Sequence, residues 1–78
     1  MKTVKYTPQD IGTLIRKTRK GLGVTQKSLA LTSGTGLRFI IELEKGKETA
    51  EVGKVLTILQ TLGIQLTLTP PPAATKRG

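Results

Sequence analysis

The segment that most constrains the fold of this chain is residues 26–46, where two short helical stretches lie on either side of a glycine-containing turn. Gly34 lies in the turn, where a positive φ is expected, and glycine adopts such a φ without strain. Ala30 is small at the point where the two helices must approach each other closely. Apolar residues at helical spacing can pack between the two stretches: Leu29, Ile40 and Leu43. The pattern predicts two short helices joined by a tight turn, the second helix running from Leu37 to Glu44.

Two longer helical patterns flank this segment. The first begins with Thr7 as a capping residue and Pro8 at the first helical position, and glycines end it near Lys20. The other follows Thr49, which we expect to cap it, and ends at Gly63. Its apolar residues keep helical spacing: Val52, Val55, Leu56, Leu59 and Leu62. The predicted fold class is therefore all-α, with four to five helices.

After Gly63 the period of the apolar residues changes. Residues 64–69 alternate strictly between apolar and polar, which is typical of a strand, and three prolines then end the pattern. No second strand pattern is evident, and a lone strand would leave its N–H and C=O groups unpaired. We therefore expect the strand to pair with the same strand of a second copy, the alternative being a frayed extended segment. The predicted dimerisation residues are Leu59, Leu62, Ile64, Leu66 and Leu68. Residues 70–78 are predicted to form a disordered tail.

The size and composition of the chain exclude several classes of protein. A chain of 78 residues is enough for one small domain that is marginally stable alone. It has no cysteine or histidine, so disulfides and nitrogen or sulfur metal sites are excluded and oligomerisation is the expected supplement. The acidic residues show no paired acid–base arrangement, so we expect neither an enzyme nor a cofactor.

No apolar run approaches the roughly 18 residues of a membrane span, and residues 1–10 lack a signal-peptide pattern. We expect a cytoplasmic, nucleoid-associated protein.

The charge of the chain favours a nucleic-acid partner. Thirteen Lys and Arg residues against five Asp and Glu give a net charge of +8. Several of the basic residues crowd the first quarter of the chain, and residues 1–6 are predicted to form a basic N-terminal arm. The alternatives are a solvated basic face without a partner and a basic ribosomal-type peptide. The two short helices of residues 26–46 form a helix-turn-helix, a unit whose second helix enters the major groove of DNA.

Three stretches resemble the Xre and phage-repressor family of helix-turn-helix proteins: Thr25–Ala30, Gly34 and Phe39–Lys47. With the neighbouring helices, the resemblance covers about residues 7–63. It implies a lambda-repressor-like DNA-binding domain of four to five helices.

The residues at the two ends of this region narrow the resemblance to one group within the family. The ending Leu59–Leu68, taken with the opening Tyr6–Pro8, is similar to antitoxins of the HipB type. In those proteins a carboxyl-terminal strand pairs across a homodimer. The resemblance therefore implies that residues 64–69 form such a dimerisation strand.

The resemblance also assigns roles to individual positions. Gln26 matches a glutamine that contacts the DNA backbone and braces the reading helix, the alternative being a solvated first-turn residue. Arg19 and Glu44 match an arginine–glutamate pair, which we expect to be structural because a buried partner left alone would be costly. Three lysines are placed near phosphate, or else are solubilising surface residues: Lys27, Lys45 and Lys47.

The residues that open the second helix of the motif read bases in the family; here they are Thr35, Gly36, Leu37, Arg38, Ile41 and Glu42. Arg38 could donate to O6 and N7 of guanine, or contact a phosphate instead. Glu42 could accept from N4 of cytosine, or be an exposed charge that DNA repels. Leu37 could touch a thymine methyl group.

Three reading positions depart from the family pattern. Gly36 stands where a serine or threonine often caps the helix, and glycine caps less well. Leu37 and Ile41 are apolar where polar residues are common. Either the chain reads methyl groups and DNA shape, or its DNA affinity is weak and mostly electrostatic.

Two functions are consistent with these observations. The first is a sequence-specific repressor that binds a palindromic operator in the major groove as a homodimer. In its HipB-like form it would be an antitoxin that silences its own operon and neutralises a HipA-type kinase toxin. The second is a protein-interaction module that keeps the helix-turn-helix fold but binds little specific DNA, which the apolar Leu37 and Ile41 favour.

Overall fold

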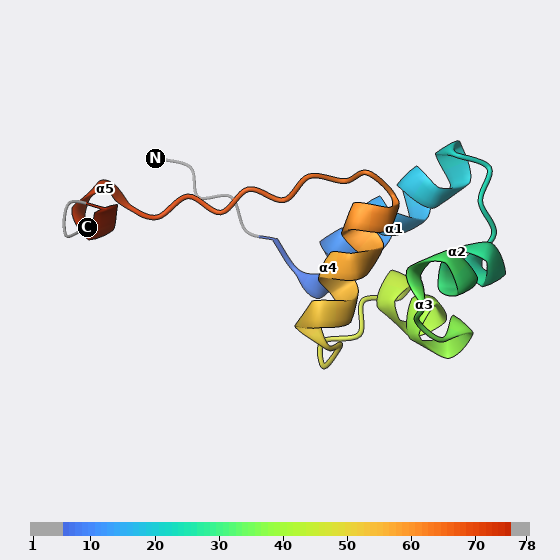
Figure 1. Cartoon of the computed structure of the whole chain (residues 1–78). Coiled ribbons are helices and arrows are strands. Elements are labelled where there is room, and N and C mark those ends of the chain that lie inside the picture. The colour runs from blue at the N-terminus through green and yellow to red at the C-terminus, as the bar shows by residue number, and fades with distance from the viewer. Residues whose placement is uncertain (1–5, 76–78) are drawn as a thin grey trace.

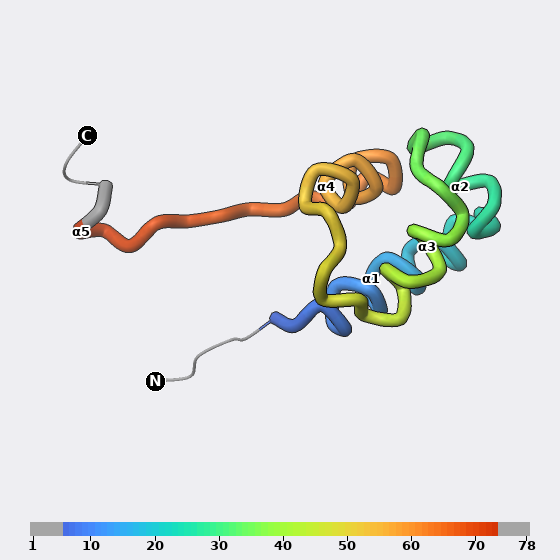
Figure 2. Tube along the Cα trace, turned by 90° about the horizontal axis from the view of Figure 1, so that it is seen from below, coloured from blue at the N-terminus to red at the C-terminus, as the bar shows by residue number. Residues whose placement is uncertain are grey.

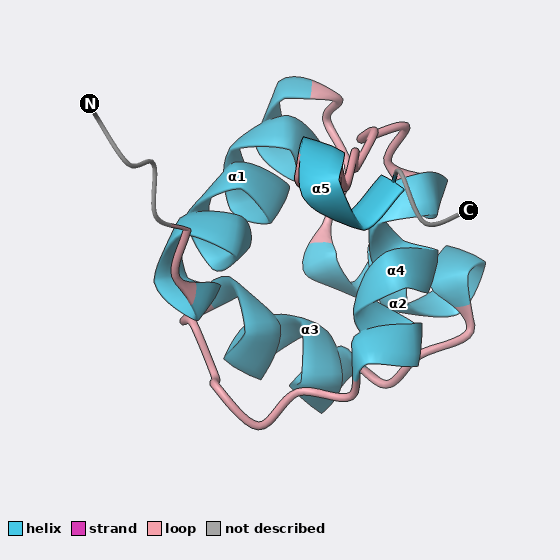
Figure 3. Cartoon of the chain, turned by 90° about the vertical axis from the view of Figure 1, so that its left-hand side faces the viewer, coloured by secondary structure: helices cyan, strands magenta, loops and turns pink. Residues whose placement is uncertain are grey.

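The computed structural model describes residues 6–75, which form helices joined by loops (Figure 1). In chain order they are α1 (Pro8–Gly21), α2 (Gln26–Ser33), α3 (Leu37–Glu44), α4 (Val52–Thr61) and α5 (Pro72–Thr75). Within residues 6–75 no segment is a strand, as the colouring of Figure 3 shows, and the predicted all-α class is confirmed. None of the helices in this part of the chain is both long and apolar enough to cross a membrane.

Two of the predicted helix caps are present, and one prediction was wrong. Thr7 and Asp10 form a capping box, in which the Asp10 amide donates to Thr7 Oγ1 at 3.1 Å and the Thr7 amide donates to Asp10 Oδ2 at 2.9 Å. Thr25 caps α2 by accepting from the Ser28 amide at 3.0 Å. Thr49, however, does not cap α4, whose N-cap residue is Glu51. Thr49 lies in a turn, Ala50 packs against the core, and α4 begins only at Val52, so Thr49 comes two residues too early to be its N-cap.

The first four helices surround one aliphatic core. Each contributes one side chain that is at most 1% exposed: Ile15, Leu29, Ile40 and Ile58. Burying a side chain of this size contributes about 1.5–3 kcal/mol, so these four residues are a large part of what holds the helices together. The inward positions predicted for the helix-turn-helix, Leu29, Ile40 and Leu43, are all buried.

The reading helix candidate α3 packs against both α1 and α2, while α2 also packs against α4. Gly12 makes the α1–α3 approach possible, because a Cβ atom there would collide with the carbonyl oxygen of Leu43. Thus α1 lies directly against the carboxyl-terminal half of α3, which fixes the direction in which α3 points.

The segment that follows α4 leaves the domain in an extended form (Figure 2). Ile64 still packs against the core, whereas Leu66 and Leu68 are 56% and 82% exposed. A strand at residues 64–69 would need a second copy as its partner and stays a prediction. In the segment expected to be a disordered tail, α5 forms a single helical turn. The predicted basic arm lies outside the described residues except for Tyr6, which is exposed.

Candidate nucleic-acid interface

The turn between α2 and α3 is fixed by its own hydrogen bonds. Gly34 ends α2 with a φ of 73°, the positive value expected from the sequence. The Thr35 amide donates to the Ala30 carbonyl oxygen at 3.1 Å, and the Ser33 and Thr35 hydroxyls lie 2.9 Å apart. Thr35 is therefore partly buried and held within the turn.

One face of α3 points away from the core. Ile40, Leu43 and Glu44 are buried, whereas the positions expected to read bases are exposed or partly exposed: Leu37, Arg38, Ile41 and Glu42. The Arg38 side chain is 90% exposed. The structure therefore brings these predicted reading positions together on one surface.

The amino-terminal end of α3 has no side-chain cap. Gly36 is the N-cap residue and makes no side-chain hydrogen bond, as its lack of a side chain requires. Its φ of −86° is one that any residue adopts, so glycine is not needed there for backbone reasons. The first N–H groups of α3 are consequently not capped by this residue.

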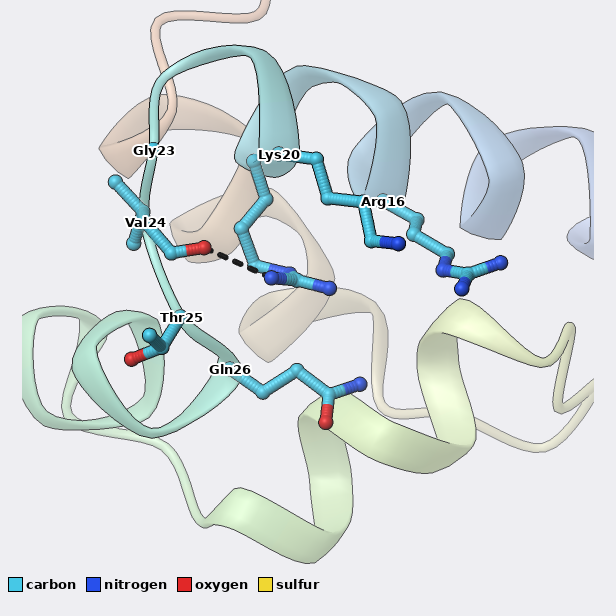
Figure 4. A pocket seen from close by; sticks show the side chains of 7 residues that line it. Arg16, Lys20, Gly23, Val24, Thr25 and Gln26 are labelled. Atoms are coloured by element: carbon cyan, nitrogen blue, oxygen red, sulfur yellow. Dashed lines mark hydrogen bonds between the residues drawn. The ribbon is translucent and has the colours of Figure 1, made fainter.

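A buried ion pair locks α1 to the end of α3. Arg19 donates from Nε to Glu44 Oε2 at 2.6 Å and from Nη2 to Glu44 Oε1 at 3.0 Å, and the two side chains are 8% and 3% exposed. Arg19 Nη1 also donates to the Val24 carbonyl oxygen at 2.8 Å, the bond drawn in Figure 4. Hydrogen bonding to Glu44 raises the pKa of the Arg19 guanidinium above its usual value. This pair has the geometry of the structural pair expected from the sequence.

Gln26 joins the same network from the first turn of α2. Its Nε2 donates to Glu44 Oε1 at 3.1 Å, so one carboxylate ties together α1, α2 and α3. Because Gln26 is only partly buried, its remaining surface faces outward beside the exposed face of α3. The position suits the bracing role expected for this glutamine.

Glu42 is engaged by two neighbouring cations. Lys47 Nζ donates to Glu42 Oε1 at 2.9 Å, and Arg38 Nε lies 3.8 Å from Glu42 Oε2. The hydrogen bond from Lys47 is the main cause that lowers the pKa of the Glu42 carboxyl. Glu42 thus offsets part of the positive charge that Arg38 and Lys47 present to a ligand. Lys27 and Lys45 are exposed and form no ion pair among the described residues.

Arg16 belongs to this surface, although the sequence analysis did not select it. Its side chain projects from α1 into the space shared with Lys20 and Gln26 (Figure 4). The sequence shows only that Arg16 lies three positions before Arg19 on one side of α1, and the packing of α1 decides which surface it borders.

Two of the expected dimerisation residues lie in the core of the single chain. Leu59 and Leu62 are only 6% and 8% exposed. The helical period of α4 instead turns Val52 and Leu56 outward, so they supply its exposed apolar surface.

Within residues 6–75 no group of three or more acidic side chains is placed to hold a metal ion.

Comparison with known proteins gives one family. A family profile described as a helix-turn-helix domain matches residues 12–68. The uncharacterized HTH-type transcriptional regulator y4mF of Sinorhizobium fredii is 52% identical over 65 residues, which cover 83% of this chain and 86% of that protein.

Solved structures of HipB share the fold. The chain matches one in a HipA-HipB-O2-O3 complex with a TM-score of 0.77 and 25% identity, covering 88% of this chain and 97% of that chain. A chain in a HipB-O4 20mer complex matches with a TM-score of 0.76 at 25% identity and the same two coverages. The resemblance to HipB-type proteins predicted from the sequence is confirmed, and the chain belongs to the helix-turn-helix domain family.

Proposed function

We propose that this chain is a transcriptional repressor that binds a palindromic operator as a homodimer, with α3 in the major groove. The observation that carries the proposal is the geometry of α3. Its exposed face presents Leu37, Arg38 and Ile41, while its buried end is fixed through Glu44 to Arg19. A reading helix must be held rigidly in this way, since small misplacements lose the hydrogen bonds that distinguish bases.

Base recognition would combine one polar and two apolar side chains. Arg38 is long and exposed enough to donate two hydrogen bonds to guanine. Leu37 and Ile41 offer methyl and methylene groups that suit the thymine methyl. Glu42, held by Arg38 and Lys47, would share its carboxylate between these cations and the N4 amino group of cytosine.

Phosphate contacts would supply most of the affinity. Lys27 follows Gln26 in the first turn of α2, Lys45 and Lys47 follow α3, and all three are exposed. With a net charge of +8, the chain would release bound counterions from DNA, which makes affinity fall steeply with salt.

The homodimer would form through residues 64–69. In the single chain this segment is extended and has Leu66 and Leu68 exposed, as a strand awaiting a partner would. A symmetric dimer would read two half-sites about 10 base pairs apart, or a multiple of that spacing.

A finer proposal is that the chain is the antitoxin of a HipBA-like pair, which silences its own operon and neutralises a HipA-type kinase. The support is the fold shared with HipB chains, one of which lies in a complex with HipA. A co-purification with the product of the adjacent gene tests this part separately, and a neighbour unlike a kinase would contradict it.

A second candidate function is a protein-interaction module with little specific DNA binding. The observation in its favour is that the reading face carries two apolar side chains, Leu37 and Ile41, and a carboxylate that partly neutralises Arg38.

A gel-shift titration with the DNA upstream of the chain's own gene distinguishes the two functions. A repressor gives a discrete complex that survives an excess of competitor DNA at physiological salt, whereas a protein-interaction module gives none. Arg38→Ala should then weaken operator binding more than nonspecific binding by about 1–3 kcal/mol if Arg38 reads a base. Equal losses on both DNAs would reduce Arg38 to a phosphate contact.

A further inference from the structure

Arg16 occupies a central place on the surface that surrounds the reading helix. It lies on α1 and lines two neighbouring hollows. The first, of about 500 Å³, it shares with Lys20 and with Gln26 at the start of α2 (Figure 4). The second, of about 260 Å³, it shares with Gln26 and with Ile41 and Lys45 on α3. Arg16 thus lies on α1 beside residues of both helices of the motif.

The charge of Arg16 is not neutralised by the protein. The side chain is exposed, and among the described residues it forms no ion pair. Glu44 also lines the second hollow, but both of its oxygens already accept hydrogen bonds from Arg19, and one accepts from Gln26 as well. A guanidinium in this position is therefore available to an anion from outside the protein.

We propose that Arg16 is a phosphate anchor, which binds the DNA backbone beside Gln26 when α3 lies in the major groove. This inference rests on the proposed function. Ile41 on the reading face and Lys45 border the same hollow as Arg16, so a duplex that contacts Ile41 brings its sugar–phosphate strand toward this hollow. Guanidinium binds phosphate through two parallel hydrogen bonds, and Lys20 and Lys45 add positive charge on either side.

The buried pair of Arg19 and Glu44 would also position the phosphate anchor. Arg19 uses its hydrogen bonds on Glu44 and on the Val24 carbonyl oxygen, and it holds α1 at a fixed distance from α3. Arg16, one turn earlier on the same helix, is then placed at a fixed distance from Ile41 and Lys45. Contacts to phosphate set the register of a protein on its duplex, so Arg16 would help to align α3 with the bases.

The test compares Arg16→Ala with Lys17→Ala. Each variant removes one positive charge from an exposed position on α1, but Lys17 lines neither hollow. The full-length wild-type chain is first used to select a duplex from a randomised pool. Binding of that duplex is then measured by fluorescence anisotropy from 50 to 300 mM salt, on the order of the range in which counterion release dominates.

Arg16→Ala should bind about tenfold more weakly and should lower the slope of log affinity against log salt by about 1.8, the loss of one phosphate contact from each protomer of the dimer. Lys17→Ala should lose about twofold or less and keep the wild-type slope. Arg16→Lys should restore the slope, because it keeps the charge, but only part of the affinity, because it lacks the planar fork. Arg16→Gln, which keeps the aliphatic stem, is used if Arg16→Ala lowers the urea midpoint.

Equal affinities and slopes for Arg16→Ala and Lys17→Ala would overturn the anchor while leaving the proposed function intact. A wild-type chain that selects no duplex would overturn both, and this result is distinguishable because it is seen before any variant is compared.

Discussion

The buried pair of Arg19 and Glu44 gives the sharpest test of how the reading helix is held. Glu44→Ala removes the carboxylate that accepts two hydrogen bonds from a guanidinium whose side chain is only 8% exposed. Leaving a buried charge without its partner costs about 3–5 kcal/mol. A chain of 78 residues has a total stability of about 4–12 kcal/mol, so the loss would be a large share of it. The melting temperature should fall by at least about 12 °C.

The assay is urea unfolding followed by far-UV circular dichroism, at one fixed protein concentration because a dimer's stability depends on concentration. Glu51→Ala is the matched control, since Glu51 pairs with Lys54 at 3.4 Å on the surface and its side chain is 72% exposed. It should cost about 1 kcal/mol or less. Combining Arg19→Met with Glu44→Leu should recover much of the loss, because no charge then remains unpaired.

Equal losses for Glu44→Ala and Glu51→Ala would refute the reasoning. They would mean that water reaches Arg19 and takes the place of the carboxylate. A double variant no more stable than Glu44→Ala would likewise show that the loss comes from packing and not from the unpaired charge.

Three further perturbations have expected outcomes. Gly12→Ala should destabilise the chain by about 1–3 kcal/mol because its Cβ would meet a backbone oxygen of α3. Gly53→Ala, which has open space around it, should be neutral or stabilise by up to about 1 kcal/mol. Similar urea midpoints for the two variants would contradict this expectation. Because the pKa of Glu42 is lowered in the folded chain, its stabilising contribution is present above the unfolded-state pKa and is lost as the pH falls through the folded-state pKa. The melting temperatures of wild type and Glu42→Gln should therefore differ at pH 7 and converge in acid. A difference that stays constant with pH would exclude the Glu42 carboxylate charge as its cause. Leu66→Gln combined with Leu68→Gln should weaken the dimer in sedimentation velocity without changing the helical signal, and an unchanged dimer would refute pairing through this segment.

Much of the fold could be predicted because its signals are local. The capping box of Thr7 and Asp10 and the cap of Thr25 each involve residues three apart, and the positive φ of Gly34 depends on its own turn. The wrong cap at Thr49 is the opposite case. There Ala50 packs against the core before α4 begins, and this contact with residues distant in the chain is not visible in the local sequence.

The candidate site likewise has some features that could be predicted from the sequence and others that depend on the packing of the helices. The family resemblance placed Arg38 and Ile41 on the reading face, and the structure leaves Arg38 exposed and Ile41 partly exposed. It did not show that Lys47, beyond the end of α3, would donate to Glu42 and compete with DNA for that carboxylate. Nor did it single out Arg16, whose importance depends on where α1 crosses the other two helices.

The sequence by itself determined the helices, the tight turn at Gly34 and the family resemblance, because each follows from residues close together in the chain. Only the tertiary structure showed how deeply the expected Arg19–Glu44 pair is buried and which cations remain available to a ligand. Arg19 and Glu44 are 25 positions apart and meet because α1 packs against α3, whereas Arg16 on the same helix forms no ion pair with any described residue. Electrostatic interactions depend on distance and burial in space, and these are properties of the folded chain.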